Sequence, residues 1–185
     1  MHRFVSAVAF IMTLSICLSA SAAGPASLWL DVPFVPQQRD GCGAATIAMV
    51  MQYWEQHQGQ PLQPEAEPAQ ILRAVYSAPA HGTYASAMTL YFQQHGYRAF
   101  AYAGDIADLQ HQLAQGRPLI AALKPESGSS LHYVVVVGLD QSQQLVIVND
   151  PAQRKLLKVE QSLFEQEWKS IGNWTLLAVP ESNTH

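Results

Sequence analysis

The stretch Asp40-Gly41-Cys42-Gly43-Ala44-Ala45-Thr46 is the point at which a polar, glycine-rich turn gives way to an apolar helical pattern. Apolar residues then recur with a period of about 3.6 over residues 44–58, which predicts a helix that ends at Gly59. Cys42 therefore lies at a helix N-terminus, where the local electrostatics favour the thiolate. Because the thiolate is the nucleophilic form of cysteine, this position favours a reactive residue.

The remainder of the chain divides into a helical first half and a β-rich second half. Further helices are expected over residues 69–76, after a cap at Thr83, and between a cap at Asp105 and a stop at Gly116. Strands are expected over residues 118–123, 132–139, 145–149, 154–159 and 174–179, with a short helix over 163–168. Helices followed by an antiparallel sheet make an α+β fold.

The strand expected over residues 132–139 contains a near-continuous β-branched run, which is typical of a strand buried on both faces. A turn at residues 140–143 leads into the strand over 145–149, and this short connection predicts an antiparallel hairpin. In that register, His132 and Asp150 come together at one end of the sheet. The pair could supply a base, and a group that orients the base, to a nucleophilic cysteine.

Each of these residues also has a structural interpretation. Cys42 could be a small buried thiol without reactivity, and His132 could be an ordinary histidine at a strand edge. Asp150 precedes a proline, where aspartate is common as a turn residue. Asn149 is a second candidate for the group that orients the histidine. The joint pattern of a thiol at a helix start, a histidine entering a strand and an acid ending the paired strand favours a catalytic site.

Residues 1–22 are predicted to be a secretory signal peptide, because a short basic start is followed by an apolar run and a small-residue stretch. Residues 23–185 would then form a single extracytoplasmic domain, periplasmic or secreted, without a transmembrane domain after signal removal. An uncleaved anchor and lipidation of Cys17 are the alternatives, although Ile16 stands where a lipidation site prefers a small residue. Signal removal leaves Cys42 without a disulfide partner in the chain.

The amino-acid composition limits which classes of partner and cofactor are expected for this chain. The formal net charge is −4, and charged residues make up only 13% of the chain. No basic face is visible, so a nucleic-acid partner is not expected. Cys42 has no CxxC partner and the sequence holds no HExxH motif, so neither a metal nor another cofactor is expected.

Three parts of the sequence carry a family resemblance: residues 32–37 (Val-Pro-Phe-Val-Pro-Gln) with 41–45 (Gly-Cys-Gly-Ala-Ala), residues 132–138 (His-Tyr-Val-Val-Val-Val-Gly), and residues 148–151 (Val-Asn-Asp-Pro). In order and approximate spacing they resemble the motifs of the peptidase C39 family, which are papain-like cysteine peptidases. The resemblance extends from about Leu30 to Val179. It implies a papain-like α+β fold, with the nucleophile at a helix start in the N-terminal half and an antiparallel sheet in the C-terminal half.

The resemblance also implies a role for each motif residue. Cys42 would be the nucleophile, His132 the acid/base and Asp150 the orienting residue. In this family a glutamine shortly before the cysteine supplies a donor to the oxyanion hole. Gln37 matches it best, and Gln38 is the alternative one residue away. The backbone N–H of Cys42 would be the second donor.

The expected function is an exported cysteine peptidase that hydrolyses peptide or protein substrates through a thioester on Cys42. Another thiol acyl-transfer enzyme, such as a cell-wall peptide amidase or a transglutaminase-like enzyme, and a non-catalytic peptide-binding module remain as alternatives. Many family members are fused to an ABC transporter and cut leader peptides after a Gly-Gly pair. Because no transporter segment is seen here, a stand-alone member is expected, and leader-peptide processing is not carried over.

Overall fold

A computed structural model describes residues 27–125 and 131–181, so the predicted signal peptide lies outside the described residues. The helices are α1 (Cys42–His57), α2 (Pro68–Val75), α3 (Ala85–Gln94), α4 (Ile106–Ala114) and α5 (Gln161–Lys169), with a 3-10 turn η1 (Pro64–Ala66). The strands are β1 (Ser27–Trp29), β2 (Tyr76–Ser77), β3 (Gly82–Thr83), β4 (Tyr97–Ala103), β5 (Leu119–Leu123), β6 (His132–Asp140), β7 (Leu145–Asp150), β8 (Arg154–Glu160) and β9 (Trp174–Pro180). The expected α+β class is confirmed.

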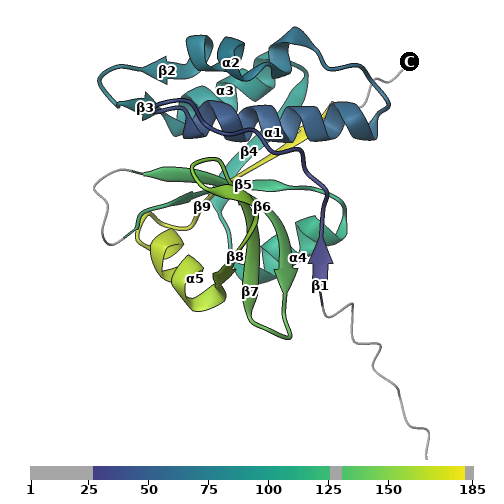
Figure 1. The fold of residues 1–185 in the computed structure, drawn as a ribbon, viewed down its shortest axis with the longest axis vertical. Helices are drawn as coiled ribbons and strands as arrows, with labels where there is room; N and C mark the ends of the chain where they lie inside the picture. The colour runs from purple at the N-terminus through teal and green to yellow at the C-terminus, as the bar shows by residue number, and fades with distance from the viewer. Residues whose placement is uncertain (1–26, 126–130, 182–185) are drawn as a thin grey trace, which may run out of the picture.

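One antiparallel sheet with the order β4-β9-β5-β6-β7-β8 organises the molecule, and β1 pairs with the far end of β6. Helices α1 to α3 form a layer on one side of the sheet, and α4 and α5 lie on the other side (Figure 1). Strands β2 and β3 make a separate small hairpin beside α1. The start of α1 and the first residue of β6 thus come from two layers that face each other.

Strand β6 is buried on both faces, as its β-branched run predicts. Val135 and Val137 pack in the core beneath α1, whereas Val134 and Val136 pack with the side chains of α4 and α5. This alternation follows the two-residue period of a strand. Since every side chain of the run is fixed from one side or the other, β6 is a rigid base for the residue that begins it, His132.

Two helix-start predictions have different outcomes. Asp105 caps α4 as expected, because its Oδ1 accepts a hydrogen bond from the backbone N–H of Asp108 at 2.7 Å. Thr83 does not cap α3: it lies in β3, and the helix begins after Tyr84 without a side-chain cap. The prediction for Thr83 was wrong because its backbone pairs with Tyr76 in the small hairpin.

The division into a helical half and a β half also needs correction. Strand β4 lies among the helices in sequence, yet it pairs with β9 at the edge of the sheet. It has mixed burial and an exposed Phe100, so its pattern does not match a buried strand. Strand β1 was also missed, and it pairs with β6 through Gly138. A Cβ atom at Gly138 would lie 2.6 Å from the carbonyl oxygen of Leu28, so glycine is what allows this approach.

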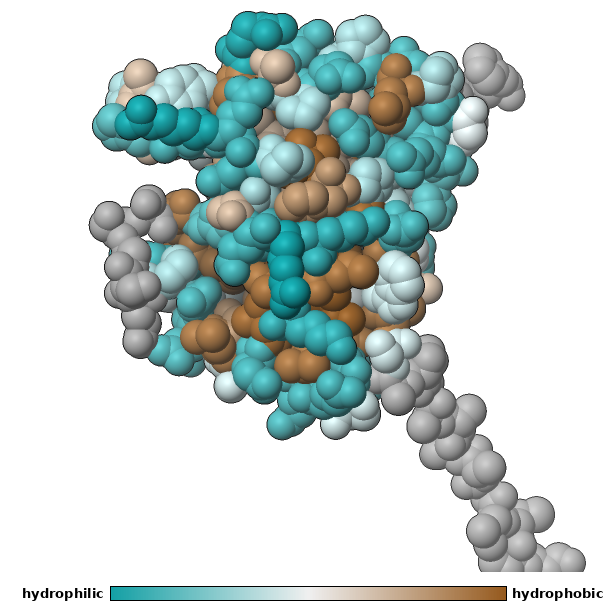
Figure 2. Space-filling view, in the orientation of Figure 1, coloured by the Kyte–Doolittle hydropathy of each residue, from teal (hydrophilic) through white to brown (hydrophobic). Residues whose placement is uncertain are grey.

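The face shown in Figure 2 is mostly polar over the helical layer, whereas apolar side chains gather over the sheet layer below it. Within the residues that the structure describes, no helix has both the length and the apolar character needed to cross a membrane.

Candidate active site

The glycines on either side of Cys42 are explained by close contacts at the start of α1. A Cβ atom at Gly41 would lie 3.0 Å from the carbonyl oxygen of Gln38, which also accepts the N–H of Gly41 to close the turn. A Cβ atom at Gly43 would lie 2.7 Å from the Cβ of Thr83 in β3. The chain therefore enters the helix directly at Cys42, which is a free, partly exposed thiol.

No side chain caps α1 in the described part of the chain. The first N–H groups of a helix have no partner within the helix, so those of the first turn, including that of Cys42, are not taken by a cap. Together with the helix dipole, they make the surroundings of the thiol favourable to negative charge.

His132 and Asp150 meet at one end of the sheet, as the hairpin register predicts. The Nε2 atom of His132 lies 2.7 Å from the Oδ1 atom of Asp150. The same carboxylate accepts the backbone N–H of Ala152 at 2.8 Å and the side-chain amide of Gln153 at 2.7 Å. Asp150 therefore belongs to a turn and also binds the histidine.

The charges of Cys42, His132 and Asp150 stabilise one another. Burial opposes the His132 cation, but hydrogen bonds to Asp150 and Cys42, and their negative charges, raise the pKa of His132 from 6.5 to about 9. Burial also opposes the Asp150 carboxylate, but the hydrogen bond and charge of His132 hold the pKa of Asp150 below its usual value. His132 therefore contacts both Cys42 and Asp150. Because Nε2 is used by Asp150, Nδ1 is the ring atom left for the thiol.

Gln37 and Gln38 differ in how they are held. The backbone N–H of Gln37 donates to the carbonyl oxygen of Pro151 at 2.9 Å, directly beyond Asp150. The Oε1 atom of Gln37 is buried and accepts no hydrogen bond from the described residues. Gln38 is exposed. Of the two, Gln37 is the one tied to the His132–Asp150 end of the sheet.

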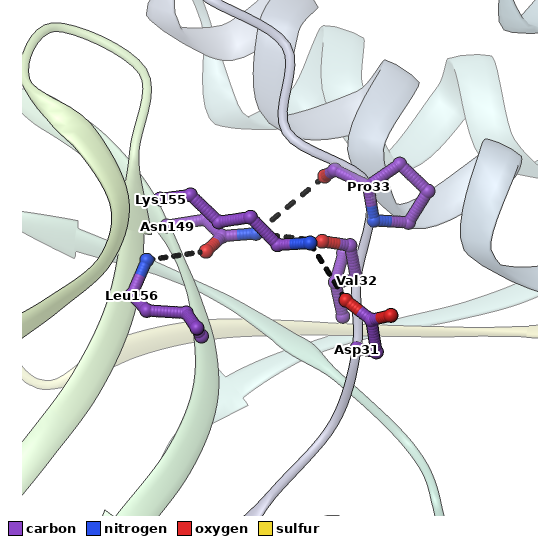
Figure 3. Close-up of polar contacts among 6 residues, drawn as sticks. All are labelled: Asp31, Val32, Pro33, Asn149, Lys155 and Leu156. Atoms are coloured by element: carbon purple, nitrogen blue, oxygen red, sulfur yellow. Dashed lines mark hydrogen bonds and ion pairs between the residues drawn. The ribbon is translucent and has the colours of Figure 1, made fainter.

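Asn149 faces away from the histidine. Its Nδ2 atom donates to the carbonyl oxygens of Val32 and Pro33 at 3.1 and 3.5 Å, and its Oδ1 atom accepts the backbone N–H of Leu156 at 3.0 Å (Figure 3). Close by, Lys155 binds Asp31 at 2.6 Å. Both ends of the Asn149 amide thus bind groups outside the site. Within the described residues, Asp150 and not Asn149 binds His132.

The role of Tyr133 near Cys42 was missed from the sequence. The hydroxyl of Tyr133 donates to the carbonyl oxygen of Thr83 at 3.3 Å. Burial, followed by the negative charge of Cys42, raises the pKa of Tyr133 to about 12, which keeps the phenol neutral. Tyr133 binds Thr83 across 50 residues of sequence, so only the tertiary structure brings it near the thiol.

A polar hollow of about 920 Å³ lies at the other end of α1, lined among others by Trp54, Glu55, Arg98 and Arg117. None of the catalytic candidates lines it. Among the described residues, no group of three or more His, Cys, Asp or Glu side chains is arranged to hold a metal ion.

The sequence model of the Peptidase_C39 like family matches residues 29–176. The chain belongs to this family. A comparison with curated proteins gives no match. The family resemblance inferred from the motifs is confirmed.

Solved structures of other C39-like and cysteine peptidases share the fold. A protein from Bacillus anthracis assigned as a C39-like peptidase is 20% identical with a TM-score of 0.66, covering 85% of this chain and 99% of its own. A double glycine motif protease from an AMS/PCAT transporter, solved with its leader peptide, is 21% identical with a TM-score of 0.61, covering 82% and 94%. Xylellain, a cysteine protease from Xylella fastidiosa, is 15% identical with a TM-score of 0.54, covering 86% and 87%. This C39-like chain thus has the papain-like cysteine peptidase fold.

Proposed function

We propose that this C39-like protein is an exported cysteine peptidase in which Cys42 is the nucleophile, His132 the acid/base and Asp150 the orienting residue. The observation that carries the proposal is the 2.7 Å contact of His132 with Asp150, together with the interaction with Cys42 that raises the pKa of His132. A binding module would have no use for a thiol, an imidazole and a carboxylate connected in this order.

In the proposed reaction the Cys42 thiolate attacks the carbonyl carbon of a peptide bond, and a C–S bond forms. The negative oxygen of the tetrahedral intermediate is held by the side-chain amide of Gln37 and the backbone N–H of Cys42. The backbone of Gln37 supports this role, since its N–H binds the carbonyl oxygen of Pro151, directly beyond Asp150.

The C–N bond then breaks, and His132 gives its proton to the leaving amine. A water molecule next loses a proton to His132 and attacks the thioester carbonyl, which releases the carboxylic acid and regenerates the thiolate. Asp150 binds the Nε2 side of the ring throughout, so that Nδ1 stays directed at the reacting atoms.

A peptide as substrate is supported by one relative, since the double glycine motif protease was solved with a leader peptide. Leader-peptide processing itself is not part of the proposal. Export is proposed from the composition of residues 1–22. Mass spectrometry of the protein from the extracytoplasmic fraction should find a chain that begins at Ala23, and an intact Met1 there would contradict cleavage.

The catalytic proposal is tested by alkylation of Cys42 with iodoacetamide as a function of pH, and by digestion of a peptide library. The wild type should be alkylated well below pH 8, and His132→Ala should remove that reactivity because no imidazolium then stabilises the thiolate. His111→Ala, which changes an exposed histidine of α4, is the matched control and should react as the wild type does.

The wild type should cut library peptides, and Cys42→Ala should not. Acyl transfer to added amines without any cleavage would favour the transglutaminase-like alternative. If Cys42 titrates as an ordinary thiol and His132→Ala changes nothing, the catalytic assignment is wrong.

A further inference from the structure

We propose that Asn149 is a positioning residue for the oxyanion hole: it fixes the segment that carries Gln37, and so sets where the Gln37 amide lies relative to Cys42. The inference rests on the proposed function, because Gln37 has a catalytic role only if that proposal holds. Asn149 is fully buried, and it makes no contact with the thiol or the histidine in the described geometry.

The segment over residues 32–37 lies outside every helix and strand of the described chain. Pro33 and Pro36 have no backbone N–H to donate, so the segment has few hydrogen bonds that can hold it. At one end, the amide of Asn149 binds the carbonyl oxygens of Val32 and Pro33. At the other end, the N–H of Gln37 binds the carbonyl oxygen of Pro151.

Asn149 is itself held by an irregularity in the pairing of β7 with β8. The pairing of β7 with β8 shifts register between Val148 and Asp150, so Asn149 is skipped in the ladder. Opposite it, Leu156 has a φ of 54°, in the left-handed region that leucine rarely adopts. This bulge directs the N–H of Leu156 to the Asn149 side chain at 3.0 Å (Figure 3). The amide of Asn149 is therefore fixed in orientation, with its donor end toward the segment.

The consecutive residues Asn149, Asp150 and Pro151 each bind a different part of the site or its support. Neighbouring residues of a strand point to opposite faces, so the end of β7 presents Asp150 to His132 and Asn149 to the segment. Pro151 then accepts the N–H of Gln37. These three consecutive residues thus fix the position of the base, His132, relative to the oxyanion donor, Gln37. Because Asn149 faces two carbonyl oxygens on one side and the N–H of Leu156 on the other, this position needs both a donor and an acceptor, and aspartate would set a buried charge against the carbonyl oxygens.

The experiment compares two reactions of the full mature chain. Alkylation by iodoacetamide needs the Cys42–His132 pair but forms no oxyanion, whereas acylation by 4-nitrophenyl acetate passes through a tetrahedral oxyanion. Asn149→Ala should slow acylation by about 10- to 100-fold, because a small misplacement of a catalytic group has effects of that size. The rate and pH profile of alkylation should stay as in the wild type.

Tyr53→Phe is the matched control. It also removes a side-chain hydrogen bond to a backbone carbonyl, that of Gly116 at 2.7 Å, but at the opposite end of α1 from Cys42. It should leave both reactions unchanged. In the double variant with Gln37→Ala, the effect of Asn149→Ala on acylation should disappear, because it acts through Gln37. Equal loss of both reactions, or a full effect in the double variant, would overturn the inference.

Hydrogen exchange supplies a readout that needs no catalysis. In Asn149→Ala, residues 32–37 should take up deuterium faster, including at the Gln37 amide, while Tyr53→Phe should leave them protected. If Asn149→Ala proves too unstable to purify, Asn149→Ser gives the same comparison with a smaller change. Unchanged exchange overturns the inference even in an inactive protein. A wild type that shows this exchange pattern but no acylation overturns the proposed function instead.

Discussion

Replacing Asp150 by asparagine tests how far the protonation of His132 depends on the buried carboxylate. Asp150 is 4% exposed and receives three hydrogen bonds, from His132, Ala152 and Gln153. Asparagine keeps the volume and one acceptor oxygen, so the turn after β7 should keep its shape. What the substitution removes is the negative charge beside the ring.

The expected change follows from the structure. The pKa of His132 is about 9, against 6.5 for an ordinary histidine. A hydrogen bond to a charged group contributes about 1.5–3 kcal/mol, and a change of one pH unit corresponds to about 1.4 kcal/mol. In Asp150→Asn the pKa of His132 should therefore fall by about 1 to 2 pH units, since Cys42 still favours the cation.

The assay is an NMR titration of the His132 ring in the wild type and in the variant. Asp140→Asn is the control, because it removes another buried carboxylate, at the opposite end of β6, and should leave the titration of His132 unchanged. A midpoint in Asp150→Asn within about half a pH unit of the wild type would refute the reasoning. So would an equal fall in Asp140→Asn.

Three further predictions concern catalysis, packing and pH. Gln37→Ala should lower kcat by about 100- to 1000-fold in steady-state kinetics, while Gln38→Ala, a change at an exposed residue, should leave kcat unchanged. A loss of kcat in Gln38→Ala but not in Gln37→Ala would assign the oxyanion donor to Gln38 instead. Gly138→Ala should lower the free energy of unfolding by about 1–3 kcal/mol in urea titrations, because its Cβ would lie 2.6 Å from a carbonyl oxygen of β1. Gly82→Ala, whose nearest atoms are 3.9 Å away, is the control and should be tolerated. Because the pKa of His132 is raised to about 9, its protonated ring should contribute up to about 3 kcal/mol to the free energy of unfolding. In urea titrations at a series of pH values, this contribution should be complete below pH 6.5 and lost as the pH rises through 9. A free energy of unfolding that does not change over this range, or that falls equally in His132→Gln, would contradict the prediction.

The elements that could be predicted are those whose signal is local. The start of α1, the cap at Asp105 and the buried strand β6 each depend on a few neighbouring residues. The hairpin of β6 and β7 joins residues only a short distance apart, which is why the contact of His132 with Asp150 followed from the sequence.

The features that were missed depend on partners far along the chain. Strand β4 pairs with β9, and nothing in residues 97–103 alone reveals that partner. The choice between Asn149 and Asp150 as the orienting residue depends on which face each presents. That depends on the register shift between β7 and β8, which no local pattern fixes. The same holds for Tyr133, which reaches Thr83 across 50 residues of sequence.

The place of β9 has a consequence for the order of folding. Residues 174–180 form the strand that lies between β4 and β5, so β4 stays separated from the rest of the sheet until these residues are present. A chain emerging from a ribosome or a translocation channel can form the hairpin of β6 and β7 early, but β4 has to wait for its only strand partner among the described residues. Because such long-range pairing forms slowly, β4 should join the sheet late, when β9 pairs with it.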